Sequence, residues 1–182
     1  MKRVSVIGST GSGKTTFAKA LAARLGVPFV ELDALHWGPG WNEATPEELR
    51  ARVGAIIVQD SWVIDGNYFR KIGELVWTRA DTVVWLDPPW ALTFVRILLR
   101  TIRRSLTRVE LWNGNRESLR EAFLSRKSIL LFSIRTRKQR RQRFERFALP
   151  EYAHLEVHRF RSQRDADRWL GSVQRLGDAE RI

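Results

Sequence analysis

Short runs of apolar residues alternate with longer segments of helical periodicity along this chain. After the first run, Phe17, Leu21 and Leu25 recur at a spacing of four, which is one face of a helix, and Gly26 suits its C-terminal cap. Alternating strands and helices predict a three-layer α/β fold, a five-stranded parallel sheet with helices on both faces. Such sheets place ligands at the carboxyl ends of their strands. The predicted strands are 3–7, 29–33, 62–66, 82–87 and 154–160.

Capping residues predict where two more helices begin. Thr45 and Glu48 form a capping box with Pro46 at the first helical position, and Ser162 and Asp165 form another near the end of the chain. The inward faces predicted for these helices are Leu49, Val53, Ile56 and Ile57 for the first, and Trp169, Leu170, Val173 and Leu176 for the second.

The rest of the chain is predicted to be mostly helical. A helix is expected after the third strand, through Ile72, Leu75 and Val76. From Trp90 to about Leu149 the pattern is helical and basic, interrupted by Asn-Gly-Asn at 113–115. Because there are no repeats and no low-complexity linker, residues 1–182 are interpreted as a single domain.

The composition excludes several classes of protein. The chain has no cysteine, and therefore no disulfide framework, no thiolate metal site and no cysteine nucleophile. Arg96 and Arg100 interrupt its most apolar stretch, and no run approaches the roughly 20 apolar residues that a membrane span needs. The apolar run that follows the basic start is too short for a signal peptide. We therefore expect a cytoplasmic protein without a membrane segment, and the sequence leaves its oligomeric state open.

The net charge of +12 is concentrated in one segment. Residues 96–146 contain sixteen Lys or Arg and four Glu, so this segment alone carries a charge equal to that of the whole chain. Within it, RTRKQRRQRF at 135–144 has six positive residues and no negative one. Such a segment binds phosphates, either of a nucleic acid or of a small molecule. No helix-turn-helix, zinc or RNP-type signature accompanies it, so a nucleic acid partner is an alternative and not the favoured interpretation.

A phosphate-binding loop is the strongest functional signal. Residues 8–15, GSTGSGKT, match the pattern G-x-x-x-x-G-K-[ST], after an apolar strand and before an amphipathic helix. Glycines let the backbone N–H groups point at one anion, and the helix N-terminus adds its positive dipole end. We expect Lys14 to reach the β- and γ-phosphates of ATP and the Thr15 hydroxyl to ligate Mg²⁺. The predicted ATP-binding residues are Gly8, Ser9, Thr10, Gly11, Ser12, Gly13, Lys14, Thr15 and Thr16.

The class of P-loop protein follows by comparison of motifs. A GTPase needs a base-reading Asn-Lys-x-Asp, which is missing here. A motor or helicase usually shows an acidic pair after a strand, whereas Asp65 and Asp87 are followed by Gly and Pro. What remains is a small phosphotransferase.

The chain resembles the adenylate-kinase-like family of P-loop kinases, which includes nucleoside monophosphate, shikimate and gluconate kinases. The resemblance rests on GSTGSGKTT at 8–16, DGNYFR at 65–70 and DTVVWLDPP at 81–89. Adenylate kinases have Asp-Gly-Phe-Pro-Arg after the third strand; here Asn-Tyr-Phe follows Asp-Gly, and Arg70 falls one position late. The combination of LDALHW at 32–37, DGNY, WLDPP and WNGNRE at 112–117 is more closely similar to the bacterial P-loop proteins labelled topology modulation proteins, over nearly the whole chain.

The resemblance implies roles for three aspartates. Asp65, which ends a strand expected beside the P-loop strand, would hold Mg²⁺ through a water; the alternative is an Asx-turn residue in Asp-Gly-Asn. Asp87 is also placed like a metal-site carboxylate, but Pro88-Pro89 indicate that it caps the next helix. Asp33, at the end of the second strand, would orient an acceptor hydroxyl as in shikimate and gluconate kinases, or would serve as a cap or turn residue.

The acceptor side is expected in a segment at about 33–60. An exposed aromatic loop, HWGPGW at 36–41, either stacks on the acceptor or covers the core. Our candidate acceptor-binding residues are Asp33, Trp37, Tyr68 and Arg70.

The resemblance also implies an arginine-bearing lid after the fourth strand, which here is the basic segment at about 100–147. Arginine suits such a lid because its planar fork binds phosphate in a bidentate manner and stabilises the transition state. The candidate catalytic residues are Lys14, Arg116, Arg135 and Arg137, with Asn113-Gly114-Asn115 as a hinge or turn. Arg161, just after the fifth strand, lies where the family packs against adenine.

These observations predict a kinase that transfers the γ-phosphoryl group of ATP·Mg²⁺ to a small acceptor, with a nucleoside monophosphate-like acceptor favoured over a simple hydroxyl compound. Two alternatives stay open at this point. One is a nucleic-acid-associated ATP-binding protein that uses the segment 96–146, and the other is a regulatory ATP-binding protein without a free acceptor.

Overall fold

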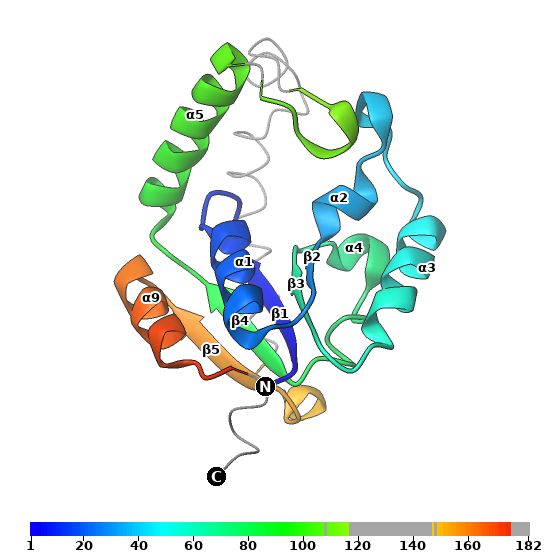
Figure 1. Cartoon of the computed structure of the whole chain (residues 1–182), viewed down its shortest axis with the longest axis vertical. Coiled ribbons are helices and arrows are strands. Elements are labelled where there is room, and N and C mark those ends of the chain that lie inside the picture. Colours follow the sequence, from blue (N-terminus) through cyan, green and yellow to red (C-terminus); the bar gives the residue numbers. More distant parts are fainter. Residues whose placement is uncertain (108, 117–146, 148, 176–182) are drawn as a thin grey trace.

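A computed structural model describes residues 1–107, 109–116, 147 and 149–175 (Figure 1). All described strands form a single parallel sheet in the order β2-β3-β1-β4-β5. This arrangement confirms the predicted five-stranded α/β fold. The strands are β1 (Arg3–Gly8), β2 (Phe29–Glu31), β3 (Trp62–Asp65), β4 (Thr82–Leu86) and β5 (Glu156–Phe160).

Alternating side chains of the central strands fill two separate cores, one on each face of the sheet. On one face, Val4 and Val6 of β1 pack beneath α1 (Lys14–Leu25) and α9 (Gln163–Ser172). On the other face, Ile7 packs with α3 (Pro46–Ile57) and α4 (Phe69–Ile72). Each face therefore carries helices, as expected for a parallel sheet whose central strands are buried on both sides (Figure 1).

The capping box predicted at α3 is complete, whereas the one predicted at α9 is half formed, because the Asp165 carboxylate accepts from the Ser162 hydroxyl at 2.6 Å and not from the Ser162 backbone N–H. The Thr45 hydroxyl accepts from the backbone N–H of Glu48 at 3.2 Å, and the Glu48 carboxylate accepts from the backbone N–H of Thr45 at 2.9 Å. At α9, the Ser162 hydroxyl accepts from the backbone N–H of Asp165 at 3.1 Å. Most of the predicted inward positions of these helices are buried or half-buried, while Leu176 lies outside the described residues.

Several predicted elements were longer than the observed ones; the fifth strand, for example, begins at Glu156 and not at residue 154. The second strand ends at Glu31, and a short helix, α2 (Leu32–His36), follows it, so Asp33 lies in a helical turn and not at a strand end. The reason is the neighbouring strand: β2 pairs with β3, and Glu31 is in register with Asp65, where β3 ends. The helix predicted through Val76 is also shorter, because Gly73 has a φ of 61° and ends α4.

After β4 the chain leaves the sheet through α5 (Trp90–Thr107), as the long helical pattern predicted. The described chain continues through 109–116, with a 3₁₀ turn at Trp112–Gly114, and reaches the 3₁₀ turn Pro39–Trp41 after α2 (Figure 1). The predicted interruption at 113–115 is therefore confirmed. Residues 117–146, including Arg135 and Arg137, lie outside the described residues.

A further 3₁₀ turn, Pro150–Tyr152, leads into β5, and its Tyr152 ring contacts Trp77 on the α4 side of the sheet. In the part of the chain that the structure describes, no helix has the length and apolar character needed to cross a membrane.

Candidate active site

The P-loop curls between β1 and α1 in a conformation that requires glycine. Gly11 has a φ of 79°, and a Cβ at this position would stand 2.6 Å from the backbone oxygen of Thr93 in α5. The loop therefore lies directly against α5. Gly13, with a φ of 91°, precedes the first residue of α1, so the free N–H groups at this helix end open towards the loop.

Lys14 and Thr15 are the first two residues of α1, directly after this loop, and they bond to different partners. The ammonium of Lys14 donates to the backbone oxygen of Ser9 at 3.4 Å, which folds the lysine over the loop. The Thr15 hydroxyl donates to Oδ2 of Asp65 at 2.5 Å. The structure thus brings together the two residues that the sequence predicted for the metal, from α1 and from the end of β3.

Asp65 is only 3% exposed, and among the described residues its Oδ1 has no hydrogen-bond partner. Burial raises the pKa of this carboxyl; the nearby Lys14 and the Thr15 hydroxyl lower it, and Asp33 raises it further. A buried carboxylate with one free oxygen beside a hydroxyl is a fitting partner for a hydrated divalent cation. Among the described residues, no group of three or more His, Asp or Glu is arranged to hold a metal by itself.

Asn67 is a site residue that sequence analysis did not single out. Its side-chain oxygen accepts from the backbone N–H of Gly8 at 3.3 Å, and its amide group donates to the Gly8 oxygen. The turn after β3 is thereby tied to the first residue of the P-loop. The sequence feature that could have identified Asn67 is its place in the motif DGNYFR. This motif begins at the end of β3, the strand beside β1.

Asp33, Trp37 and Tyr68, predicted on the acceptor side, lie together. The Tyr68 hydroxyl donates to Oδ1 of Asp33 at 2.6 Å, and the His36 ring lies 4.6 Å from the ring centroids of both Tyr68 and Trp37. Burial, followed by the charge of Asp33 and its hydrogen bond, raises the pKa of Tyr68 far above its ordinary value, so the phenol keeps its proton. The fourth candidate, Arg70, is exposed in α4.

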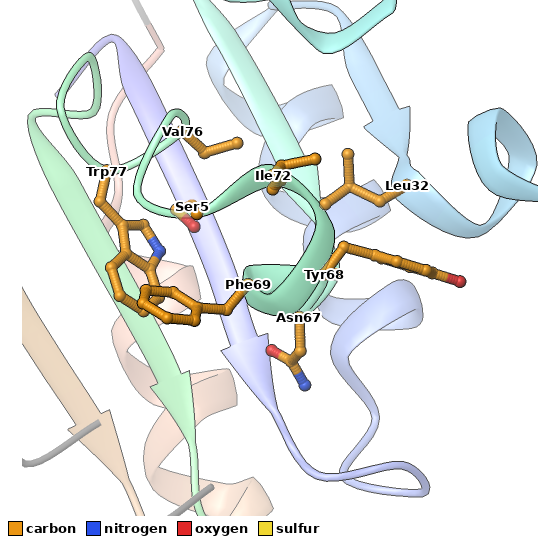
Figure 2. Close-up of a pocket in the computed structure, with 10 residues that line it drawn as sticks. Ser5, Leu32, Asn67, Tyr68, Phe69, Ile72, Val76 and Trp77 are labelled. Atoms are coloured by element: carbon orange, nitrogen blue, oxygen red, sulfur yellow. The ribbon is translucent and has the colours of Figure 1, made fainter. Parts of the chain in front are cut away.

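A pocket lies on the other side of the turn that carries Tyr68. Figure 2 shows Phe69 and Trp77 together at one side of it, with the Tyr68 ring directed away from them. Its lining is mainly apolar, and it belongs to the core beneath α4 and not to the P-loop. The residues that line it are Ser5, Leu32, Gly66, Asn67, Tyr68, Phe69, Ile72, Gly73, Val76 and Trp77.

His36 is buried, although the aromatic loop at 36–41 was expected to be exposed. It is 2% exposed, and its ring centroid lies 4.6 Å from those of Trp37 and Tyr68. Burial and then the nearby Lys71 lower the pKa of His36, which favours the neutral imidazole. Lys71 donates to Glu43 at 2.9 Å and to the Ala44 oxygen at 3.0 Å. This part of the loop is therefore packed, while Trp37 and Trp41 stay half-buried.

Glu31 is a second residue that sequence analysis missed. It is the last residue of β2, in register with Asp65. Burial raises the pKa of its carboxyl most strongly, a hydrogen bond from the Trp112 side chain lowers it, and the charges of Asp33 and Asp65 raise it again. The carboxyl end of the sheet thus gathers Glu31, Asp33 and Asp65.

Asp87 has a different partner from the one predicted. The first residue of α5 is Trp90, so the N-cap position falls at Pro89 and not at Asp87. The Asp87 carboxylate accepts instead from the Arg159 guanidinium, with Nε at 3.1 Å. The same guanidinium lies 3.8 Å from the centroid of the Trp85 ring. Asp87 therefore ties β4 to β5 at the sheet edge.

Of the arginines predicted to contact phosphate or adenine, the two that the structure describes are exposed. Arg116 is 57% exposed, and its guanidinium lies 4.0 Å from Glu110; Arg161 is exposed after β5. Arg96, which was not selected, comes nearer to the P-loop: its Nη1 lies 4.0 Å from where a Cβ on Gly13 would stand. The sequence feature that could have identified Arg96 is its position near the start of α5. This helix follows β4, which lies beside β1.

Comparison with known proteins agrees with this architecture. The model of the family "ATPase family associated with various cellular activities (AAA)" matches residues 4–64, which include the P-loop and end one residue before Asp65. No curated protein matches the chain.

Solved structures are similar over all or most of the chain. A shikimate kinase from Bacteroides thetaiotaomicron has a TM-score of 0.50 at 17% identity, covering 100% of this chain and 99% of its own. A shikimate kinase from Acinetobacter baumannii in complex with shikimate has a TM-score of 0.51 at 18% identity, covering 100% and 96%. A gluconokinase from Sinorhizobium meliloti 1021 has a TM-score of 0.49 at 18% identity, covering 93% and 91%. The fold is that of a P-loop kinase-like α/β protein.

Proposed function

We propose that this protein is an ATP- and Mg²⁺-dependent phosphotransferase that acts on a small acceptor. The observation that carries the proposal is the pair formed by Thr15 and Asp65 behind the P-loop. In P-loop phosphotransferases the hydroxyl at this position ligates Mg²⁺, and a carboxylate on a neighbouring strand supports the ion. Here the two groups meet at 2.5 Å, and the carboxylate retains a buried free oxygen.

The P-loop would supply the phosphate contacts. Its backbone N–H groups and the start of α1 favour the negative charge of ATP, and Lys14 would move from the Ser9 oxygen to the β- and γ-phosphates. Mg²⁺, held by Thr15 and through a water by Asp65, would offset the charge that develops on the transferred group. Arg161 would contact the adenine, and Arg96 would join the proposed lid residues Arg116, Arg135 and Arg137 at the phosphates.

Asp33 suggests a hydroxyl-bearing acceptor. One of its oxygens accepts from Tyr68, and the other would accept from an acceptor hydroxyl and orient it for attack. Glu31 adds a second carboxylate on this side, and carboxylates disfavour a neighbouring phosphate. We therefore place a hydroxyl compound ahead of a nucleoside monophosphate, reversing the order that the sequence suggested.

A nucleoside monophosphate-like acceptor is the second candidate. The rings of Trp37 and Trp41, with centroids 5.4 Å apart, form an aromatic wall on which a base would stack. The adenylate-kinase-like subtype, and the resemblance to topology modulation proteins, belong to this part of the proposal and rest on the motifs in the sequence. An acceptor segment at about 33–60 and a lid at about 100–147, within a single domain, are likewise proposed from the sequence.

The test is a phosphotransfer assay with a matched pair of lysine variants. The purified protein is incubated with ATP, Mg²⁺ and single acceptors: shikimate, gluconate, monosaccharides and the four common nucleoside monophosphates. We expect acceptor-dependent ADP formation that Lys14→Ala abolishes and that Lys19→Ala, a change at an exposed lysine of the same helix, preserves.

Two outcomes would contradict the proposal. Tight ATP binding without a phosphorylated product from any acceptor would favour a regulatory ATP-binding protein. DNA or RNA affinity that falls steeply with salt and is unchanged by Lys14→Ala would favour the nucleic acid alternative.

A further inference from the structure

Three consecutive residues, Gly66, Asn67 and Tyr68, connect β3 to α4, and we call them the bridging turn. The turn follows the last residue of β3 and precedes Phe69, the first residue of α4. Figure 2 shows the side chains of Asn67 and Tyr68 leaving the turn in different directions. They bond to residues 59 and 35 positions away, so the turn joins two distant parts of the chain.

The Asn67 side chain bonds to both backbone groups of Gly8, the first residue of the P-loop. Its oxygen accepts from the Gly8 N–H at 3.3 Å, and its amide donates to the Gly8 oxygen. A side-chain amide offers both a donor and an acceptor, whereas a carboxylate offers acceptors only. Asn67 therefore fixes the bridging turn to the start of the P-loop through two bonds that its amide group alone supplies.

Gly66 brings the bridging turn into contact with α2. Its φ is 144°, and a Cβ at this position would stand 2.7 Å from Cβ of Leu32, closer than real Cβ atoms approach. The Gly66 N–H also donates to the Val6 oxygen in β1 at 3.3 Å. Leu32 is the first residue of α2 and directly precedes Asp33, so this contact holds Asp33 close to the turn that bonds to the P-loop.

Tyr68 completes the link from the P-loop to Asp33. Its hydroxyl donates to Oδ1 of Asp33 at 2.6 Å, a length typical of a bond between a hydroxyl and a carboxylate. The ring of Tyr68 packs against His36, which is buried and whose Nε2 lies 3.4 Å from Nζ of Lys71. The raised pKa of Tyr68, caused first by burial, keeps the hydroxyl protonated and therefore a donor.

We propose that Tyr68 is a positioning residue that orients the Asp33 carboxylate towards the acceptor hydroxyl, and that Asn67 holds this orientation in a fixed relation to the P-loop. This inference rests on the proposed phosphotransferase function and gives Tyr68 a role that acts through Asp33 and not through contact with the acceptor. The acceptor oxygen and the γ-phosphoryl group must approach within about 3–3.5 Å in the correct direction. A turn that bonds to both the P-loop and Asp33 favours that geometry before the substrates bind.

The test compares Tyr68→Phe with Tyr152→Phe. The chain has two tyrosines, so each variant loses the same hydroxyl and keeps its ring, and Tyr152 packs on Trp77 in the core. For the acceptor that the wild-type protein phosphorylates best in the panel above, we expect Tyr68→Phe to lower kcat at least about tenfold. The KM and the calorimetric Kd for ATP should stay within about twofold, and Tyr152→Phe should match the wild type in all three constants within the same margin.

A double variant tests whether Tyr68 acts through Asp33. Asp33→Ala removes the partner of the hydroxyl, so adding Tyr68→Phe to it should cause no further loss of kcat. The kcat of Tyr68→Phe alone should be no lower than that of Asp33→Ala. A hydroxyl that contacted the acceptor directly would instead add its own loss in the double variant.

Asn67→Ala tests the link to the P-loop without relying on activity. It removes both bonds to Gly8, so hydrogen exchange at the Gly8 amide should become about tenfold faster, while amides in β4 keep their protection. Its kcat and its affinity for ATP should fall together, because the P-loop and Asp33 both lose their connection to the turn. Tyr68→Phe should leave exchange at the Gly8 amide unchanged.

The outcomes distinguish this inference from the proposed function. A wild-type protein that phosphorylates no acceptor overturns both. An active wild-type protein in which Tyr68→Phe leaves kcat unchanged, or weakens ATP binding as much as it lowers kcat, overturns the inference alone. A further loss of kcat in the double variant, or unchanged exchange at the Gly8 amide in Asn67→Ala, would also overturn it, because the bridging turn would then not connect Asp33 to the P-loop.

Discussion

The Thr15 hydroxyl donates a 2.5 Å hydrogen bond to Oδ2 of Asp65, joining the first turn of α1 to the end of β3. These two residues are 50 positions apart in the chain. They meet because β3 pairs with β1 and ends beside the P-loop. The bond occupies one carboxylate oxygen and leaves the buried Oδ1 free. The pair therefore resembles a metal site that is formed by the fold before any ion binds.

Replacing Asp65 by Asn tests this interpretation directly. The amide keeps the size of the side chain and can still accept from Thr15, but it removes the negative charge that supports a hydrated cation. We expect kcat to fall at least about 100-fold, as for loss of one preorganised electrostatic contact. Steady-state kinetics over a range of Mg²⁺ concentrations check this, with circular dichroism as the control for folding. Wild-type kcat in Asp65→Asn would show that the carboxylate has no part in the reaction.

The pH dependence of stability should change in the same variant. Because the pKa of Asp65 is raised in the folded protein, its carboxyl binds a proton more readily there than in the unfolded chain. Its contribution to stability is therefore present at low pH and is lost as the pH rises through the raised pKa. Asp65→Asn removes this loss, so its Tm without Mg²⁺ should increasingly exceed that of the wild type as the pH rises above about 4, the ordinary pKa of aspartate, until it passes the raised pKa of Asp65.

The control for this measurement is Asp60→Asn, a change at an exposed aspartate just before β3. Its Tm should follow that of the wild type across the same pH range. Mg²⁺ with a nucleotide should raise the Tm of the wild type and reduce the advantage of Asp65→Asn, because a ligand that binds the folded state stabilises it. A constant Tm difference at every pH would contradict the raised pKa.

Two glycines provide a matched pair of substitutions. In Gly11→Ala, a Cβ would meet the Thr93 oxygen at 2.6 Å in a backbone conformation with a φ of 79°, so the P-loop must distort. We expect at least about tenfold weaker ATP binding and a loss of about 1–3 kcal/mol in the free energy of unfolding. Gly54→Ala in α3 meets nothing within 4 Å and should instead stabilise the protein by about 0.5–1 kcal/mol. Urea unfolding and titration calorimetry with ATP measure both effects.

The sequence predicted the features that depend on local patterns. Apolar runs marked the five strands, the capping boxes marked helix starts, and the P-loop pattern placed Lys14 and Thr15. The position of Asp65 beside the P-loop strand also followed, because it needed only the strand order that the resemblance supplied. The strands, the helix starts and the loop depend on residues close together in the chain, whereas the position of Asp65 depends on the order of the strands.

Other features depended on contacts between distant residues. The end of β2 is set by the length of β3, and the partner of Asp87 lies in β5. The hydrogen bonds from Trp41 to Asn115 and Arg116 join residues 74 and 75 positions apart, so Asn113-Gly114-Asn115 was interpreted only as a hinge or turn. The burial of His36 likewise follows from Tyr68 and Lys71, which come from α4 and its preceding turn. No local periodicity carries such information.

Among the described arginines, Arg96 has its guanidinium beside the P-loop, with Nη1 4.0 Å from where a Cβ on Gly13 would stand. It lies in α5, whose Thr93 oxygen and Ile97 side chain crowd Gly11, so the helix is held against the loop and the guanidinium points towards Gly13. Arg96→Ala should lower kcat about 100-fold by removing a cation from the transferred phosphoryl group. Arg96→Lys should recover only part of this loss, because an ammonium lacks the planar fork. Arg103→Ala, an exposed position of the same helix, should retain kcat within about twofold, as surface changes usually do. If the rates of Arg96→Ala and Arg103→Ala fall equally, general positive charge and not this position is responsible.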